Sequence, residues 1–139
     1  MNGRRPRHAL WLLAAALASI AVIIPAGAVA ASTPTDVSIS GNADYISPTQ
    51  IVVYVTVQGS GGTGGVSVQV QQAQTPFPPQ SGFGNTAIIC DGQHRTYAVS
   101  VFSFQGFPGW QLGDAEASAS AFCPSGFTFA TRSIRITRP

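Results

Sequence analysis

The sequence predicts an all-β fold of about seven short strands, on three observations. Apolar and polar residues alternate along successive segments, which is the period of a half-buried strand. Glycine and proline, at 15 and 10 of 139 residues, separate these segments. Beyond the amino-terminal leader, no segment has the helical period, and this absence of helix candidates completes the all-β prediction.

The amino-terminal segment has the composition of a secretory signal peptide. Three arginines precede an apolar run over Ala9–Ile24, and helix breakers and an Ala28-Val29-Ala30 site follow it. A retained membrane anchor is the alternative, but this run is shorter than the roughly 20 residues that span a bilayer. We therefore expect a cleaved signal peptide over residues 1–30 and a single secreted β domain over residues 31–139. Contact with a membrane is expected only through the leader before cleavage.

Charge argues against a nucleic-acid partner. Once the leader is removed, four arginines face five acidic residues, so the mature domain is slightly acidic. The basic character of the whole chain is then an export signal and not a nucleic-acid footprint. The chain contains no lysine, so the glycine-rich segment 59–65 cannot be a phosphate-binding loop and is expected to be a flexible connection.

The two cysteines, Cys90 and Cys123, are expected to form a disulfide. Export leads to an oxidising compartment, in which paired cysteines become bonded. A zinc site is the competing interpretation, but it needs four ligands, and His94 is the one histidine after the leader. The predicted bond would stabilise the domain by about 3–4 kcal/mol through the loop it closes.

The first half of the domain predicts three strands. Asp36–Ser40 alternates, Gly41-Asn42 permits a bulge, and Ser47-Pro48-Thr49 is a turn. Gln50–Gln58, QIVVYVTVQ, is the strongest strand signal because β-branched and aromatic residues crowd it. Val66–Val70 alternates and should pair back as a hairpin.

The middle of the domain predicts a long loop and two strands. Residues 75–85, TPFPPQSGFGN, are expected to be an extended, exposed connection because of their prolines and glycines. Strands follow at Thr86–Cys90 and Thr96–Phe104. In the second of these, the apolar face changes sides partway, from Val99 and its neighbours to the phenylalanines.

The last two segments are less regular. Asp114–Cys123 alternates alanine with polar residues; alanine favours helix, but the strict alternation predicts a strand. A row of alanines leaves room for a bulky side chain opposite, such as Tyr97, Trp110 or Phe127. Phe127–Ile136 carries phenylalanine and isoleucine on opposite parities, which predicts a bulge near residues 131–133.

Seven short strands punctuated by turns predict a two-sheet sandwich of the immunoglobulin or fibronectin type. A small barrel is the alternative.

Three runs carry a resemblance to a known family. IICDGQHRTYAVSV, GDAEASASAFC and TRSIRI resemble secreted immunoglobulin-like domains of actinobacteria, over Asp36–Thr137. The resemblance implies an immunoglobulin-like fold and export, and no activity. In several such domains the cysteine matching Cys90 pairs with one that closes the second strand, where this chain has Gln58. The pairing with Cys123 therefore follows from the count of two cysteines.

A second resemblance is to the secreted enediyne-binding apoproteins of actinomycetes. It concerns size, export and the sandwich, and it implies a small-molecule pocket at one end. Those proteins usually carry two disulfides, whereas this chain has two cysteines.

No catalytic, metal-binding or cofactor-binding constellation is predicted. His94 lies in the polar turn DGQHR beside Asp91, which is typical of an exposed turn. Asp114 and Glu116 lie two residues apart on one strand, as on a solvated face, and not across a cleft as glycoside hydrolysis requires. No G-x-S-x-G nucleophile elbow occurs.

The sequence therefore predicts a non-enzymatic exported module that binds or has a structural role, with an unknown extracellular ligand or protein partner. A small-molecule carrier and a divergent hydrolase are the alternatives. The candidate binding patch consists of Phe102, Phe104, Phe107 and Trp110. These aromatics either plug one end of the fold or form an exposed patch.

Overall fold

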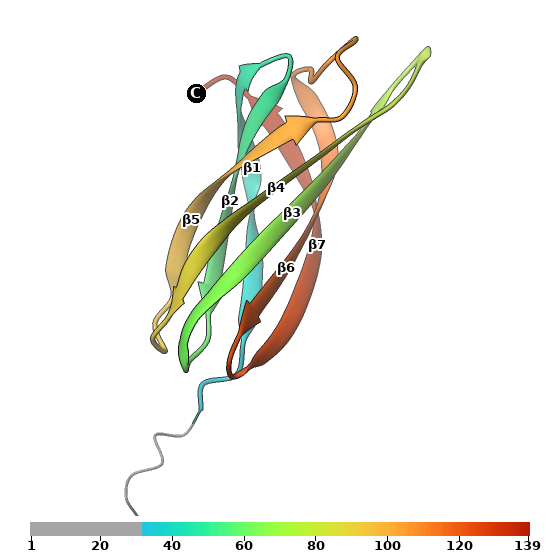
Figure 1. The fold of residues 1–139 in the computed structure, drawn as a ribbon. Coiled ribbons are helices and arrows are strands. Elements are labelled where there is room, and N and C mark those ends of the chain that lie inside the picture. Colours follow the sequence, from blue (N-terminus) through green and yellow to red (C-terminus); the bar gives the residue numbers. More distant parts are fainter. Residues whose placement is uncertain (1–31) are drawn as a thin grey trace, which may run out of the picture.

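The protein is built from seven β-strands, with no helix between residues 32 and 139, the part of the chain that the computed structural model describes (Figure 1). The predicted signal peptide, residues 1–30, lies outside this part. The all-β prediction is confirmed. The strands are β1 (Asp36–Ser47), β2 (Gln50–Gln58), β3 (Gly62–Gln74), β4 (Phe77–Cys90), β5 (Arg95–Ser103), β6 (Gly113–Cys123) and β7 (Gly126–Thr137).

The strands form a closed barrel in the order β1-β2-β5-β4-β3-β6-β7. This strand order matches the small barrel that the sequence analysis gave as its alternative, and not the two-sheet sandwich that it predicted. Most neighbours pair antiparallel through long ladders, but β4 and β5 pair only at Gly82↔Ser103 and Phe83↔Phe102. Glycine permits this contact: a Cβ on Gly84 would lie 2.0 Å from the Ser100 carbonyl oxygen. The second junction, between β1 and β7, is parallel and joins three residue pairs.

The barrel interior is filled by small and branched apolar side chains. Val53, Val55 and Val99 are fully buried, as the alternation in β2 and β5 predicts. The alanines of β6 also face inward, which confirms the strand predicted there. Trp110, 1% exposed, is the one large aromatic side chain in this core.

The disulfide is formed, as predicted. Cys90 ends β4 and Cys123 ends β6, and their Cα atoms lie 6.0 Å apart. Because β3 lies between these two strands, the bond joins three adjacent strands at one end of the barrel.

The predicted loop over residues 75–85 is wrong. Only Thr75 and Pro76 form the turn, and β4 begins at Phe77. The strand pairs with β3 from Phe77 to Cys90, and the resulting β3–β4 arm projects beyond the rest of the barrel (Figure 1). Pairing with a long partner strand has outweighed the local preference of proline and glycine. The glycine-rich segment is likewise ordered from Gly62 onward, as the start of β3.

The predicted bulge near residues 131–133 is also wrong. The register between β6 and β7 runs without a shift from Gly113↔Ile136 to Cys123↔Gly126. Ile134 and Ile136 point into the core, so the phenylalanines of opposite parity point outward. The bulge near Gly41, by contrast, is confirmed by the register shift between Ile39 and Ala43.

Candidate functional site

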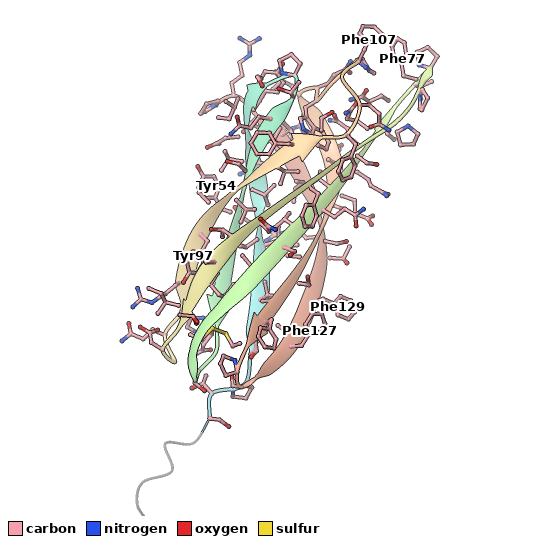
Figure 2. All side chains as sticks on the ribbon, viewed as in Figure 1. Tyr54, Phe77, Tyr97, Phe107, Phe127 and Phe129 are labelled. Atoms are coloured by element: carbon pink, nitrogen blue, oxygen red, sulfur yellow. A yellow bond between two sulfur atoms is a disulfide. The ribbon has the colours of Figure 1, made fainter. Side chains whose placement is uncertain are left out.

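Every phenylalanine of the chain is exposed, which is unusual for a side chain that normally fills cores. The exposed fractions range from 41% for Phe83 to 78% for Phe107. Figure 2 shows labelled rings projecting from the barrel rather than into it. The eight residues are Phe77, Phe83, Phe102, Phe104, Phe107, Phe122, Phe127 and Phe129.

The candidate patch predicted from the sequence is divided by the structure. Phe102, Phe104 and Phe107 are 54%, 66% and 78% exposed, as a surface patch requires. Trp110 is buried in the core, so the plug interpretation applies to it. Its ring packs closely on β4, since a Cβ on Gly82 would lie 2.4 Å from Trp110 Cζ2.

Two exposed aromatic side chains meet at the tip of the β3–β4 arm. The rings of Phe77 and Phe107 meet edge to face, with centroids 5.6 Å apart and an interplanar angle of 85° (Figure 2). Such pairs add about 0.5–1.5 kcal/mol beyond their buried area. The turn of the arm and the segment between β5 and β6 therefore hold each other by this contact, and each ring keeps an exposed face.

Three buried glutamines, which the sequence analysis did not identify, fasten this segment. Gln74 Nε2 donates to the Gly109 carbonyl at 2.7 Å, and Gln72 Nε2 donates to the Gln111 carbonyl at 2.8 Å. Gln80 Nε2 donates to the Gln105 carbonyl at 2.9 Å. The alternation in β3 and β4 could have identified these glutamines, because each one lies at a position whose side chain points into the barrel.

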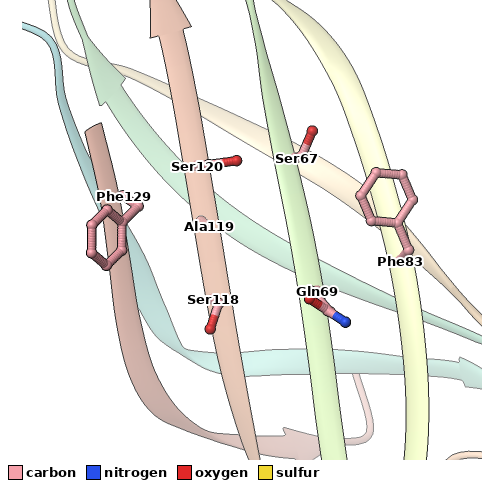
Figure 3. Close-up of a pocket in the computed structure, with 7 residues that line it drawn as sticks. All are labelled: Ser67, Gln69, Phe83, Ser118, Ala119, Ser120 and Phe129. Carbon is pink, nitrogen blue, oxygen red and sulfur yellow. The ribbon is translucent and has the colours of Figure 1, made fainter. Parts of the chain in front are cut away.

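A second group of aromatics lies on the outer face of β4, β3, β6 and β7. A shallow pocket of about 150 Å³ lies there between Phe83 on β4 and Phe129 on β7. Figure 3 shows the two rings on opposite sides, with Ser118 and Ser120 of β6 and residues of β3 between them. The strand register fixes this arrangement, because Gln69 faces Phe83 on one side and Ser118 on the other.

The floor of this pocket is polar and uncharged. Ser67, Gln69 and Ser120 contribute hydroxyl and amide groups that have no side-chain hydrogen-bond partner within residues 32–139. Ser118 alone is paired, with Thr131 at 3.3 Å. Donors and acceptors between two aromatic rings are the composition of a ligand-binding surface.

The sequence did not lead to this pocket, although the signal was present. Phe127 and Phe129 alternate with residues of the inward parity that end in Ile134 and Ile136. A bulge near residues 131–133 would have brought the phenylalanines and the isoleucines to the same side of the strand. Without it, strict alternation places the rings outside.

The turn between β4 and β5 provides no catalytic pair. Asp91 accepts hydrogen bonds from Arg95 Nε at 3.2 Å, and not from the exposed His94. The hydrogen bond from Arg95 is the main cause that lowers the pKa of Asp91, with smaller help from backbone donors. The contact is a surface ion pair.

Asp114 and Glu116 lie on the outer face of β6, beside an open depression of about 480 Å³ beneath the β3–β4 arm. Asp114 lies 4.0 Å from Arg135, and both side chains are largely exposed.

Within residues 32–139, no three histidine, cysteine, aspartate or glutamate residues gather as a metal site would require. No helix in this part of the chain is long and apolar enough to span a membrane.

Comparison with known proteins gives no family. No protein-family model matches the chain, and no curated protein matches its sequence. Among solved structures, the fold is similar to part of the selenomethionine-labelled β-glucosidase from Kluyveromyces marxianus, with a TM-score of 0.43 and 14% identity. The match covers 76% of this chain and 15% of the β-glucosidase. At this level of likeness we transfer neither a fold family nor an activity.

Proposed function

We propose that the protein is an exported, non-enzymatic binding module that contacts its ligand through phenylalanine side chains. The observation that carries this proposal is the exposure of all eight phenylalanines while valine, isoleucine and alanine fill the core. Exposed apolar surface of this extent is rare unless a ligand or a partner covers it. Aromatic side chains also supply much of the energy at binding surfaces.

The alternatives receive less support from the described residues. A carrier needs a deep apolar cavity, whereas the barrel interior holds packed side chains that include Trp110. A hydrolase needs convergent titratable groups, and the carboxylates of Asp114 and Glu116 lie on one strand at an open surface.

We also infer that the barrel is built as an immunoglobulin-like sandwich whose two sheets touch at their edges. The long ladders join β1, β2 and β5 on one side and β4, β3, β6 and β7 on the other. The two junctions between these groups involve two and three residue pairs. This strand order and the weak junctions support the sandwich interpretation.

Export is proposed on the leader sequence. Cleavage after Ala30 should release a mature protein that begins at Ala31. Intact mass of the protein from the culture medium tests this, and a secreted species that still contains Trp11 would contradict it.

The binding function is tested by NMR titration of residues 31–139 with a panel of ligand classes. The panel contains neutral polysaccharides, acidic polysaccharides, a mixed peptide library and phosphatidylcholine vesicles. We expect saturable shifts for amides beside exposed phenylalanines with at least one class. Shifts with no class, or shifts remote from the phenylalanines, would overturn the proposed function.

A further inference from the structure

The pocket between Phe83 and Phe129 is one end of a longer furrow. A neighbouring depression shares Gln69 and Ser118 with it, and the depression beneath the arm shares Gln71 and Glu116 with that neighbour. The three hollows therefore follow one another along the outer surface of β3 and β6. We call this continuous hollow the furrow. At about 3.4 Å per residue, it extends roughly 20 Å from Ser120 to Asp114. A hollow of this length suits a linear chain better than a compact ligand.

The floor of the furrow consists of three facing pairs: Ser67 with Ser120, Gln69 with Ser118, and Gln71 with Glu116. Apart from the Ser118–Thr131 contact, these side chains have no hydrogen-bond partner within residues 32–139. Serine offers one donor and two acceptor positions, and glutamine offers two of each. The ligand that satisfies such a floor carries many hydroxyl groups that both donate and accept.

The walls at one end of the furrow are aromatic. Phe83 and Phe129 are 41% and 72% exposed and lie three strand steps apart, about 14 Å between backbones. Flat rings present a negative face to which weakly positive C–H groups bind. A sugar ring has apolar C–H faces and a rim of hydroxyl groups, so it matches both the walls and the floor.

The charge of the furrow disfavours an anionic polymer. No lysine, arginine or histidine lines the three hollows. Arg135 lies 4.0 Å from Asp114, so Glu116 is the acidic group of this lining that has no basic partner within residues 32–139, and it repels carboxylate, sulfate or phosphate groups. The ligand is therefore uncharged over most of its length.

The backbone of the furrow excludes an added peptide strand. β3 is paired with β4 along its length and with β6 from Gly65 to Gln71, and β6 is also paired with β7. Along the floor of the furrow, neither strand therefore has a free edge for β-strand addition. A folded protein partner would also need an apolar centre, whereas the centre of this surface is polar.

We propose that a linear, uncharged polysaccharide binds in the furrow, with its sugar rings against Phe83 and Phe129 and its hydroxyl groups on the serine and glutamine floor. This proposal rests on the binding function inferred above and names its ligand class and place.

Native affinity electrophoresis tests the proposal with residues 31–139 in gels that contain one of three soluble neutral polysaccharides: hydroxyethylcellulose, laminarin or glycol chitin. Polygalacturonate gels serve as the acidic comparison. We expect retardation by at least one neutral polymer and none by polygalacturonate. Phe129→Ala and Phe83→Ala should each weaken binding about tenfold or more. Gln69→Leu keeps the size of the side chain, removes its amide and should weaken binding measurably.

Ile46→Ala and Ile89→Ala are the controls, because they remove exposed apolar side chains, 50% and 54% exposed, that line none of the three hollows. Their retardation should equal that of the unmodified protein. Absence of retardation in every neutral gel, or retardation that Phe129→Ala leaves unchanged, would overturn the polysaccharide proposal.

The NMR panel distinguishes failure of the polysaccharide proposal from failure of the proposed binding function. If peptides, vesicles or a second copy of the chain shift the amide signals of the furrow residues, the polysaccharide proposal is wrong and the binding function stands. Absence of binding with every class would overturn both.

Discussion

The two outer faces of the barrel differ in how their polar side chains are hydrogen-bonded. On the face formed by β1, β2 and β5, polar groups bond to one another across the strands. Tyr54 donates to Asp44 at 2.7 Å, and the hydroxyls of Thr56 and Thr96 lie 2.8 Å apart. We call this the paired face. On the opposite face, the serine and glutamine side chains of the furrow other than Ser118 have no such partners within residues 32–139, and aromatic rings lie beside them.

This difference supports the proposal that the furrow, and not the paired face, binds the ligand. Cross-strand pairs stabilise a sheet, by about 0.2–1 kcal/mol each. Exposed phenylalanines and unpaired polar groups contribute little to folding, so their occurrence together around the furrow needs another explanation. The proposed binding function offers one.

If the exposed rings serve binding, they should contribute little to the stability of the fold, whereas the buried Trp110 should contribute much. Trp110→Ala should destabilise the protein by about 3–5 kcal/mol because it leaves a cavity in the core. Phe129→Ala should change stability by less than about 0.5 kcal/mol. Chemical denaturation of both variants measures this. Similar losses in the two variants would remove the distinction between inside and outside rings.

The disulfide belongs to the furrow side of the barrel, because it joins β4 to β6 across β3. Cys90→Ala should lower the free energy of unfolding by about 3–4 kcal/mol through loss of the closed loop. Hydrogen exchange of the variant should accelerate more in β4 and β6 than in β1 and β2. Equal acceleration on both faces would show that the bond stabilises the barrel as a whole.

A direct comparison of hydroxyl groups sharpens the contrast between the faces. Thr56→Val removes a paired hydroxyl from the paired face and should cost about 0.2–1 kcal/mol. Ser120→Ala removes a hydroxyl that has no partner in the furrow and should cost less. Thermal unfolding of the two variants measures the difference between their losses of stability. A larger loss for Ser120→Ala would mean that the furrow hydroxyl has a structural role.

The smallest expected effect concerns pH. Arg95 lowers the pKa of Asp91 below its usual 3.8, so the carboxylate form is favoured in the folded protein. The resulting stability is fully present above pH 3.8 and is lost as the pH falls through the lowered pKa. Because the pair is exposed, Asp91→Asn should flatten the acid side of the stability curve only slightly. An unchanged curve for this variant would show that the pair makes no contribution.

Much of the fold was predictable because it depends on alternation. The residues of Gln50–Gln58 and of the alanine strand have the period of a half-buried strand, and two cysteines can form only one disulfide within the chain. Long-range pairing was not predictable in the same way. Residues 77–85 look like a loop by composition, and they become a strand because β3 supplies a partner along their length.

The sequence did not reveal the position of the furrow, for a physical reason. The sequence drew attention to aromatics near Trp110, but adjacency along the chain does not reveal which rings reach the core. The furrow depends on register across four strands, which brings Phe83 and Phe129 to opposite sides of residues far from both in sequence. No local pattern contains that information.

Hydroxyl-radical footprinting, with and without a saturating neutral polysaccharide, tests the central claim most directly. Without ligand, the phenylalanines should oxidise readily and Trp110 should not. With ligand, Phe83 and Phe129 should become protected, while Phe104 and Phe107 keep their reactivity. Oxidation of Trp110 in the free protein, or protection that spares Phe83 and Phe129, would contradict the account.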